Sequence, residues 1–377
     1  MPADARPTPF GFHEGFGVGA AEADAVLLLR CLLGPTPRSL HALIWATGSA
    51  SQALDRIRRG GGSDNDRSFL AQADPDRIRG RVAEAGARFA APGDADYWPA
   101  FLRLADPPVG VFVRGRTLGP GVVRVAIVGS RRPTATGREV AADLARGLAS
   151  AAMITVSGGA FGIDAAAHRG ALDGGGLTVA VLGSGIDAPH PAGNRPLFVQ
   201  IESMGTLVSE YPPGVPAEPF RFPARNRLIA ALSRGVVVVE GATKSGTRIT
   251  AEHAMDLGLD VFAVPGAVTN PLAETPLGLI REGATMIRGA ADLLEDLGVD
   301  MDRTGQGPAP EGLSGVEREV FEVLTGPMLP ALVAQAAGIS QGDALSALIG
   351  LELRGLVRGN GGRFDRTFRR EDGRASA

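Results

Sequence analysis

Short apolar runs recur along the middle of the chain at intervals of 25–30 residues. Their last residues are Val128, Val156, Leu182, Ser209, Val239 and Val264. Between them, apolar residues at spacings of three and four predict helices over Gly137–Ala149, Ile163–Leu172, Arg227–Leu232 and Ile249–Leu257. Strands that alternate with helices at this interval form right-handed crossovers onto a buried parallel sheet. The pattern predicts an α/β fold over residues 93–299, an extended Rossmann-like, doubly wound parallel sheet that binds ligands at the carboxyl ends of its strands.

The regions on either side of this core have different patterns. Residues 1–20 are rich in Pro and Gly and predict a loose arm, whereas residues 21–92 carry helical spacings over Ala25–Leu33, Arg38–Trp45 and Ser51–Ile57. This second region predicts a small helical domain (SAM-like or helix-hairpin-helix-like). A helix-hairpin-helix would hold phosphate at a helix N-terminus, but a helical packing domain is the preferred interpretation.

The C-terminal region begins with a polar, Gly- and Pro-rich linker over residues 300–312. Residues 313–370 then predict three short helices, Ser314–Leu324, Leu329–Ala337 and Gly342–Arg354, and a hairpin over Gly355–Phe368. Three helices and a hairpin are typical of a winged helix. Residues 371–377 form a tail.

Composition narrows the functional classes. A hydrophobic fraction of 44% supports a large core and excludes global disorder. The single cysteine, Cys31, excludes a disulfide framework and a Cys-based zinc site, and five histidines leave little for a His-rich metal centre. No metal and no cofactor is expected. The sequence shows no apolar run of about 20 residues, which predicts a cytoplasmic protein without membrane contact.

The net charge of −3 means that nucleic-acid binding would depend on a local basic patch. Of the 38 basic residues, only Lys244 is lysine. The number of arginines is therefore weak evidence for nucleic-acid binding, because it reflects the general composition of the chain.

Glycine-rich loops follow the first two predicted strands, Gly129–Thr134 and Ser157–Asp164. Glycine lets the backbone approach a ligand, and serine and helix N-terminal N–H groups donate to anions, so the two loops predict a phosphate cradle. The third loop, Gly183–Ala188, matches a dinucleotide fingerprint but runs into Pro189 without opening a helix. Lys244, after the fifth strand, is either a phosphate contact or a solvated loop residue.

The segment Phe220–Arg234 combines four arginines with two phenylalanines and holds no acidic residue. Interleaved arginine and aromatic side chains suit single-stranded nucleic acid, because guanidinium groups meet phosphates and rings stack on bases. The alternative is that Phe220 and Phe222 are core residues and that some of the arginines hold the sheet edge.

Asp164 and His168 lie four residues apart on one predicted helix. A catalytic pair is conceivable, but no nucleophile or metal set accompanies it, so a structural role is preferred. Glu210 and Glu240 end strands on the ligand side, where they could orient arginines as easily as act in catalysis.

These motifs, in this order, resemble the DNA-processing protein A family (DprA/Smf). The similarity is densest from Tyr97 to Ile287 and includes VAIVGSRRPT, SGGAFGIDAAAHRGAL, AVLGSGID, FPARNRLIAALS and VVVEGATKSGTRITAEHA. The chain departs from the family pattern at Ala135 or Thr136, Gly159, Thr247-Arg248 and His190-Pro191, which affects details of the pocket.

The resemblance implies a non-catalytic protein that binds single-stranded DNA, dimerises through its Rossmann-like core, protects strands taken up in natural transformation and helps load RecA. It makes Arg131 the main phosphate contact. The full implied set is Gly129, Ser130, Arg131, Arg132, Ser157, Gly158, Asn194, Arg195, Phe198, Arg225, Asn226, Arg227, Lys244, Ser245 and Gly246.

Two other functions remain as alternatives. A nucleotide or ribosyl hydrolase of similar fold would need a glutamate three residues after the threonine of Ser245-Gly246-Thr247, where this chain has Thr250. A transcription regulator would read duplex DNA through the helix Gly342–Arg354, which has almost no base-reading side chains. The C-terminal unit is therefore better interpreted as a protein-contact or regulatory module.

Overall fold

The structure, a computed structural model, describes residues 12, 16–119, 121–242, 245–298, 313–324, 328–354, 356–360 and 362–366. Most of the predicted arm, the linker over 300–312, the tail over 371–377 and Lys244 lie outside these residues. In the described part of the chain, no helix is long and apolar enough to cross a membrane.

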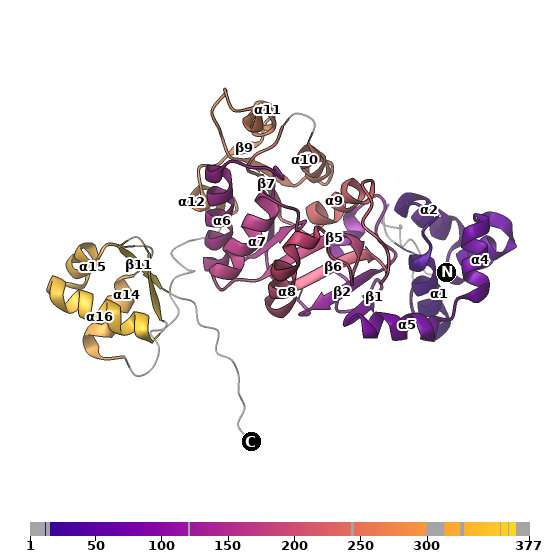
Figure 1. Ribbon diagram of the computed structural model, residues 1–377, viewed down its shortest axis with the longest axis horizontal. Helices are drawn as coiled ribbons and strands as arrows, with labels where there is room; N and C mark the ends of the chain where they lie inside the picture. Colours follow the sequence, from indigo (N-terminus) through magenta and orange to yellow (C-terminus); the bar gives the residue numbers. More distant parts are fainter. Residues whose placement is uncertain are drawn as a thin grey trace, which may run out of the picture.

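A nine-stranded sheet forms the centre of the fold (Figure 1), with the strand order β1-β2-β6-β5-β4-β3-β7-β8-β9. The strands are β1 Ala87–Ala90, β2 Val111–Gly115, β3 Arg124–Val128, β4 Ile154–Ser157, β5 Thr178–Gly185, β6 Thr206–Tyr211, β7 Gly235–Val238, β8 Asp260–Ala263 and β9 Thr285–Met286. From β6 to β9 all pairs are parallel, but β2 runs antiparallel to both β1 and β6. The prediction of a purely parallel sheet is therefore wrong at this edge, because β1 and β2 lie outside the strand–helix repeat that predicted it.

Helices cover both faces of the sheet. Successive side chains of each strand point to opposite faces, and apolar residues on both faces need to be covered. Val125 and Ile127 of β3 pack under α6 Ala135–Ser150, α7 Ile163–Asp173 and α12 Ala290–Asp296, with α8 Arg195–Met204 beside them. Ala126 and Val128 point to the other face, under α9 Arg221–Ala231, α10 Gly246–Asp256 and α11 Glu274–Arg281. These strand residues are 0–3% exposed. Burial on both faces explains their continuously apolar sequences.

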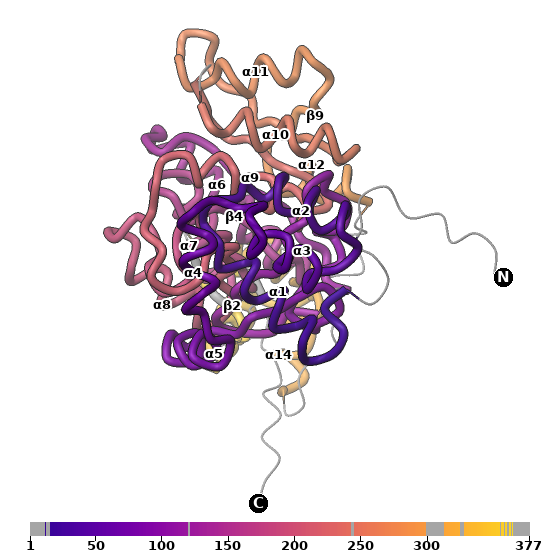
Figure 2. Tube along the Cα trace, turned by 90° about the vertical axis from the view of Figure 1, so that its right-hand side faces the viewer, coloured from indigo at the N-terminus to yellow at the C-terminus, as the bar shows by residue number. Residues whose placement is uncertain are grey.

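The N-terminal helices form a compact group that packs at one end of the sheet (Figure 2). They are α1 Ala20–Cys31, α2 Pro37–Thr47, α3 Ala50–Arg56, α4 Asp64–Gln72 and α5 Pro75–Glu84. Side-chain caps fix their starts: the Thr36 hydroxyl accepts from the Ser39 N–H, and Ser63 and Asp66 form a reciprocal capping box. Leu27 and Cys31 of α1 join a core cluster with β2, β5 and α8, so this helical region is anchored to the sheet.

A third group of elements follows residue 312: α14 Gly315–Val323, α15 Pro330–Ala337, α16 Gln341–Leu353 and the antiparallel strands β10 Val357–Asn360 and β11 Arg363–Arg366. The elements have their own apolar core, built around Val320, Val333, Leu348 and Leu351. Three helices followed by a hairpin is the element order predicted from the sequence.

The main differences from the predicted helices concern α8, α9, α11 and α12. The sequence pattern did not predict α8, α11 or α12, and α9 begins at Arg221 rather than at Arg227. Proline stands in the first turn of α8 and of α9, at Pro196 and Pro223. Proline is tolerated there because the first-turn N–H groups have no partner within the helix.

Candidate nucleic-acid interface

The carboxyl ends of β3, β4, β5, β6 and β7 meet at one edge of the sheet because these strands are parallel. β3 and β7 are neighbours, and the chain order reverses between them. This is the place where α/β sheets bind ligands. A pocket of about 810 Å³ lies along this edge, which we call the edge groove. Its lining residues are Arg131, His190, Ala217, Pro219, Phe222, Pro223, Ser245, Gly246, Arg248, Ile249 and Glu252.

The loop after β3 is held in place by Glu240. The Ser130 N–H donates to the Glu240 carbonyl at 2.6 Å, and the Glu240 carboxylate accepts from the Thr134 N–H and hydroxyl at 2.9 and 2.6 Å. A Cβ at Gly129 would lie 2.9 Å from the same carbonyl, so only glycine fits. The Ser130 hydroxyl accepts from the Arg132 N–H at 3.1 Å. The loop is therefore pre-shaped before any ligand arrives.

Arg131 stands exposed at the tip of this loop and lines the edge groove. Within the described residues, it makes no ion pair and no side-chain hydrogen bond. Its guanidinium carbon lies 5.4 Å from the centre of the Phe222 ring, and the His190 ring lies 5.6 Å from the same ring. Arg132 beside it is also exposed. The groove thus offers unpaired positive charge next to aromatic faces.

The loop after β4 uses its polar groups internally. The Ser157 hydroxyl donates to the Ile127 carbonyl at 2.7 Å, and the Gly158 and Ala160 N–H groups donate to one carboxylate oxygen of Asp164 at 3.2 and 3.3 Å. Burial raises the pKa of Asp164 above its ordinary value. Because these donors are already satisfied, Ser157 and Gly158 shape the loop rather than offer hydrogen bonds to a ligand.

Three predicted residues lie at or just before the start of α8, and two of them, Asn194 and Phe198, support the loop after β4. The Asn194 amide donates to the Gly159 and Ala160 carbonyls at 3.0 and 3.2 Å. Phe198 is 1% exposed, and a Cβ at Gly159 would lie 2.5 Å from its ring. The resemblance implied that both side chains line the path of the strand. They cannot do so, because both are buried under the loop. Arg195 is exposed at the start of α8.

Arg225 and Asn226 of α9 also point into the protein. The Arg225 guanidinium donates to the carbonyls of Gly158, at 2.8 Å, and Val181. Burial lowers the pKa of Arg225 to about 10, although the negative charge of Asp164 acts to raise it. The Asn226 amide donates to the Gly246 carbonyl at 3.1 Å. Arg225 thus connects the loop after β4 to strand β5, and Asn226 holds the start of α10.

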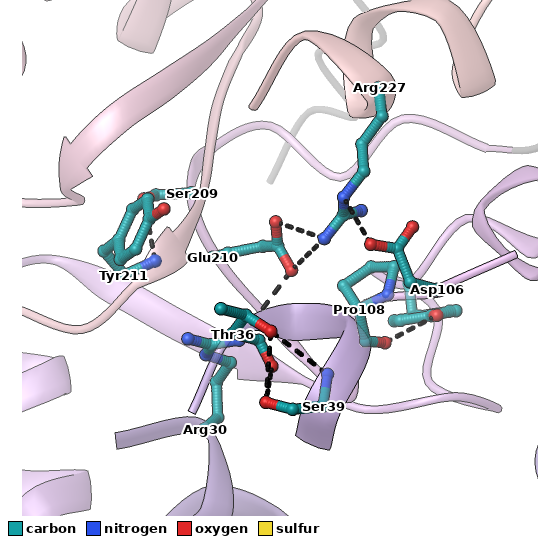
Figure 3. A network of polar contacts seen from close by, with 10 residues as sticks. Arg30, Thr36, Ser39, Asp106, Pro108, Ser209, Glu210, Tyr211 and Arg227 are labelled. Carbon is teal, nitrogen blue, oxygen red and sulfur yellow. Dashed lines mark hydrogen bonds and ion pairs between the residues drawn. The ribbon is translucent and has the colours of Figure 1, made fainter. Parts of the chain in front are cut away.

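Arg227 belongs to a buried charge network that reaches the helical region (Figure 3). One nitrogen of Arg227 donates to both Glu210 carboxylate oxygens at 2.8 Å, and its Nε lies 3.5 Å from Asp106. Arg30 of α1 lies 3.7 Å from the same Glu210 carboxylate. Burial lowers the pKa of Arg227, but Glu210 and Asp106 outweigh this effect and hold the pKa above its ordinary value. Arg227 is therefore a structural cation and not a surface contact.

The start of α10 forms another part of the groove wall. Ser245 precedes the helix and Gly246 is its first residue, and both line the groove. The Ser245 hydroxyl is buried and, in the described part of the chain, has no hydrogen-bond partner. A helix N-terminus attracts anions through its unpaired N–H groups. The predicted phosphate contact Lys244 lies just before this point, outside the described residues.

Two groove residues, His190 and Arg248, were noted in the sequence only as departures from the family pattern and are absent from the predicted contact set. His190 follows the third predicted strand, so its position signalled the groove, but only the fold brings its ring against Phe222. Arg248 comes from α10 and is paired with Glu252 and Glu282, both at 3.0 Å. Phe222 lies in the groove as a possible base platform, whereas Phe220 is 66% exposed and lies outside the groove lining.

Asp164 and His168 do not form a catalytic pair. Asp164 binds backbone N–H groups, while the His168 ring contacts the Thr178 hydroxyl at 2.7 Å. The described residues contain no group of three His, Cys, Asp or Glu side chains able to hold a metal ion. Glu210 and Glu240 orient an arginine and a loop, respectively.

Three comparisons with known proteins agree with one another. The family model for DNA recombination-mediator protein A matches residues 88–298. A Mycobacterium tuberculosis protein that bears the DprA name is 39% identical over 367 residues, covering 91% of this chain and 94% of that one. The crystal structure of DNA processing protein A from Streptococcus pneumoniae superimposes with a TM-score of 0.64 at 33% identity, covering 74% of this chain and 98% of that one. A Helicobacter pylori structure of the same name, whose subject is its single-stranded DNA binding mode, gives a TM-score of 0.51 at 29% identity, covering 56% of this chain and 97% of that one.

Proposed function

The chain belongs to the DNA recombination-mediator protein A family, and from this membership we propose that it binds single-stranded DNA without sequence preference and without catalysis. In the cell it protects incoming strands during natural transformation and helps load the RecA recombinase. The Helicobacter pylori relative supports the ligand, because its structure concerns single-stranded DNA binding.

One observation carries the proposal: the unpaired guanidinium of Arg131 lies against Phe222 in the edge groove. A phosphate that binds this guanidinium places its neighbouring base near the Phe222 and His190 rings. Only an unpaired base exposes its face for stacking, and stacking tolerates any base. The combination favours a single strand over a duplex.

The predicted contact residues divide into two classes by exposure. Arg131, Arg132, Arg195 and Gly246 are exposed and contact the strand, and the half-buried Ser245 lines the groove beside them. Lys244 remains a proposed phosphate contact. The other members of the predicted set act by shaping the loops. The buried ones are Ser157, Gly158, Asn194, Phe198, Arg225, Asn226 and Arg227, and the half-buried ones are Gly129 and Ser130, whose hydroxyl accepts from the Arg132 N–H.

The remaining parts of the proposal concern assembly. The protein forms a homodimer through its Rossmann-like core. The helical region is a small SAM-like domain, and α14, α15, α16 and the β10–β11 hairpin form a winged helix that contacts protein rather than duplex DNA. All these parts act in the cytoplasm.

Fluorescence anisotropy with labelled oligo-dT and with a duplex of equal length tests this function. We expect tight oligo-dT binding, weak duplex binding and a log–log salt slope of about −0.7 per phosphate contacted. Arg131→Ala removes an exposed cation, so it should weaken binding and flatten the slope by less than one unit.

Arg234→Ala is the matched control, because Arg234 is an exposed arginine at the opposite, amino-terminal edge of the sheet, just before β7. It should bind oligo-dT like the wild type. Loss of affinity in both variants would indicate diffuse electrostatics instead of a groove. Absence of oligo-dT binding by the wild type would contradict the proposed function.

A further inference from the structure

A second pocket, of about 520 Å³, lies between the helical region and the sheet. We call it the inter-domain pocket. The turn after α1 and parts of α4 and α5 form one wall, and residues 212–215, which follow β6, form the other. Its volume is in the range of about 300–1,000 Å³ that is usual for small-molecule sites. None of the residues identified so far in the edge groove lines it.

The walls of this pocket leave large apolar side chains uncovered. On the helical side, Leu33 is 54% exposed and Phe69 is 36% exposed, whereas Pro212 and Val215, which line the sheet side, are buried. Concave apolar surface that remains accessible in this way marks binding sites for flat or apolar groups.

Polar groups lie along the same pocket. Oδ2 of Asp66 accepts from the Ser63 N–H and hydroxyl at 3.2 and 2.6 Å, and no hydrogen bond from a described residue reaches Oδ1. A Cβ at Gly34 would lie 2.8 Å from Oδ1, so the glycine makes room for this carboxylate in the wall. Arg81 donates to the Pro213 carbonyl at 3.2 Å and joins the two walls. Apolar faces with a hydrogen-bonding edge match the chemistry of a nucleobase.

The two pockets share one segment of chain. Residues 212–215 line the inter-domain pocket and residues 217–223 contribute to the edge groove. Val215 and Ala217 are at most about 7 Å apart along an extended chain. The two pockets therefore adjoin the same loop, residues 212–223.

We propose that the inter-domain pocket holds a base of the single strand that occupies the edge groove. The inference rests on the proposed function and extends it by a second subsite, supplied by the helical region. Because the Asp66 carboxylate accepts hydrogen bonds, the pocket favours the bases that carry an exocyclic amino group, which are cytosine, adenine and guanine, over thymine. Phe69 provides the stacking face.

Anisotropy with 12-nucleotide oligo-dC and oligo-dT tests the subsite. We expect the wild type to prefer oligo-dC, and Phe69→Ala to weaken oligo-dC binding about five- to tenfold with an unchanged salt slope, because stacking involves no phosphate. Asp66→Asn retains an acceptor for Ser63 and should remove the preference for oligo-dC. The matched control is Trp45→Ala, since Trp45 is 38% exposed in the same region but does not line the pocket.

The outcomes separate this inference from the proposed function. If Arg131→Ala weakens binding while Phe69→Ala and Asp66→Asn bind both oligomers like the wild type, the subsite does not exist and the function stands. If the wild type binds neither oligomer, the function itself fails. A titration with dCMP alone distinguishes a free nucleotide from a base within a strand. Saturation by dCMP at micromolar concentration, dependent on Phe69 and unaffected by excess oligomer, would overturn the proposal.

Discussion

His168 of α7 is a fully buried titratable side chain, with 0% exposure, and lies near the amino-terminal ends of β4 and β5. The Thr178 hydroxyl donates to the Thr155 carbonyl at 2.8 Å, so it must accept from His168. This fixes the proton on Nδ1, and Nε2 has no hydrogen-bond partner in the described part of the protein. Burial lowers the pKa of His168 to about 3, with smaller contributions from Arg225 and Arg169.

Stability should therefore depend on pH through this residue. The unfolded chain binds a proton near the ordinary histidine pKa of 6.5, whereas the folded protein does so only near 3. The stability contribution of the neutral ring is fully present above pH 6.5 and is lost as the pH falls toward 3. Linkage gives a loss of about 2 kcal/mol between pH 7 and pH 5. Urea unfolding of the wild type and of His168→Asn, which retains a donor to Thr178, measures the difference. Equal pH dependence in the two proteins would contradict the assignment.

The sequence predicted loops that meet at the carboxyl edge of the sheet but could not rank their arginines by exposure. Arg131, Arg225 and Arg227 follow strand ends or begin a helix, and nothing local distinguishes them. Exposure is decided by packing: α9 starts at Arg221 and lies against the sheet, which buries Arg225 and Arg227, whereas Arg131 stands at a loop tip. The accessible arginine could thus be identified only once the helix was placed.

At the scale of elements, α16 is the reason to expect that the C-terminal unit reads duplex DNA poorly. It contains no arginine or lysine between Gln341 and Leu353. Its exposed face carries Leu345, Ile349 and Leu353, which are 43%, 46% and 85% exposed and lie four residues apart along one side. Duplex binding depends on phosphate neutralisation and on polar contacts to base edges, and this face supplies neither.

We expect the full chain to bind a duplex at least about 100-fold more weakly than a single strand of equal length at low salt. The double variant Leu345→Arg/Ile349→Arg adds two cations to the exposed face of α16. It should raise duplex affinity and steepen the duplex salt slope by at most about two units, without changing oligo-dT binding. A wild-type duplex affinity equal to the single-strand affinity would contradict this account of α16.

Elements differ in how well the sequence predicts them. Strands β3 to β8 were predicted within a few residues, because both of their faces are buried and the apolar runs are unbroken. β1, β2 and β9 lie outside the strand–helix repeat or are only two residues long, and so give a weaker pattern. Strand periodicity predicts a central parallel strand well and an edge strand poorly.

At the scale of the whole molecule, the charge network around Glu210 joins the helical region to the sheet. Arg30, Glu210 and Arg227 have side chains that are 3–5% exposed, and Asp106 completes two positive and two negative charges. Removing one member of a buried network costs far more than removing a surface pair, because a desolvated charge loses its partner. We therefore expect the network to make the two regions unfold together, although each has its own apolar cluster.

Arg30→Ala should break this coupling. We expect a loss of about 3 kcal/mol in the free energy of unfolding, since Glu210 keeps only Arg227. The two tryptophans report the two regions: Trp45 lies in α2 and Trp98 packs under the sheet. Trp98→Phe leaves Trp45 as the fluorescent reporter, and Trp45→Phe leaves Trp98. With the network intact, the urea transitions of the two reporters should coincide. With Arg30→Ala, the transition reported by Trp45 should occur at a lower urea concentration than the one reported by Trp98. Arg79→Ala breaks an exposed pair with Asp24 and should cost less than about 1 kcal/mol without separating the transitions. Coincident transitions in Arg30→Ala would mean that the apolar contacts of α1 alone couple the two regions.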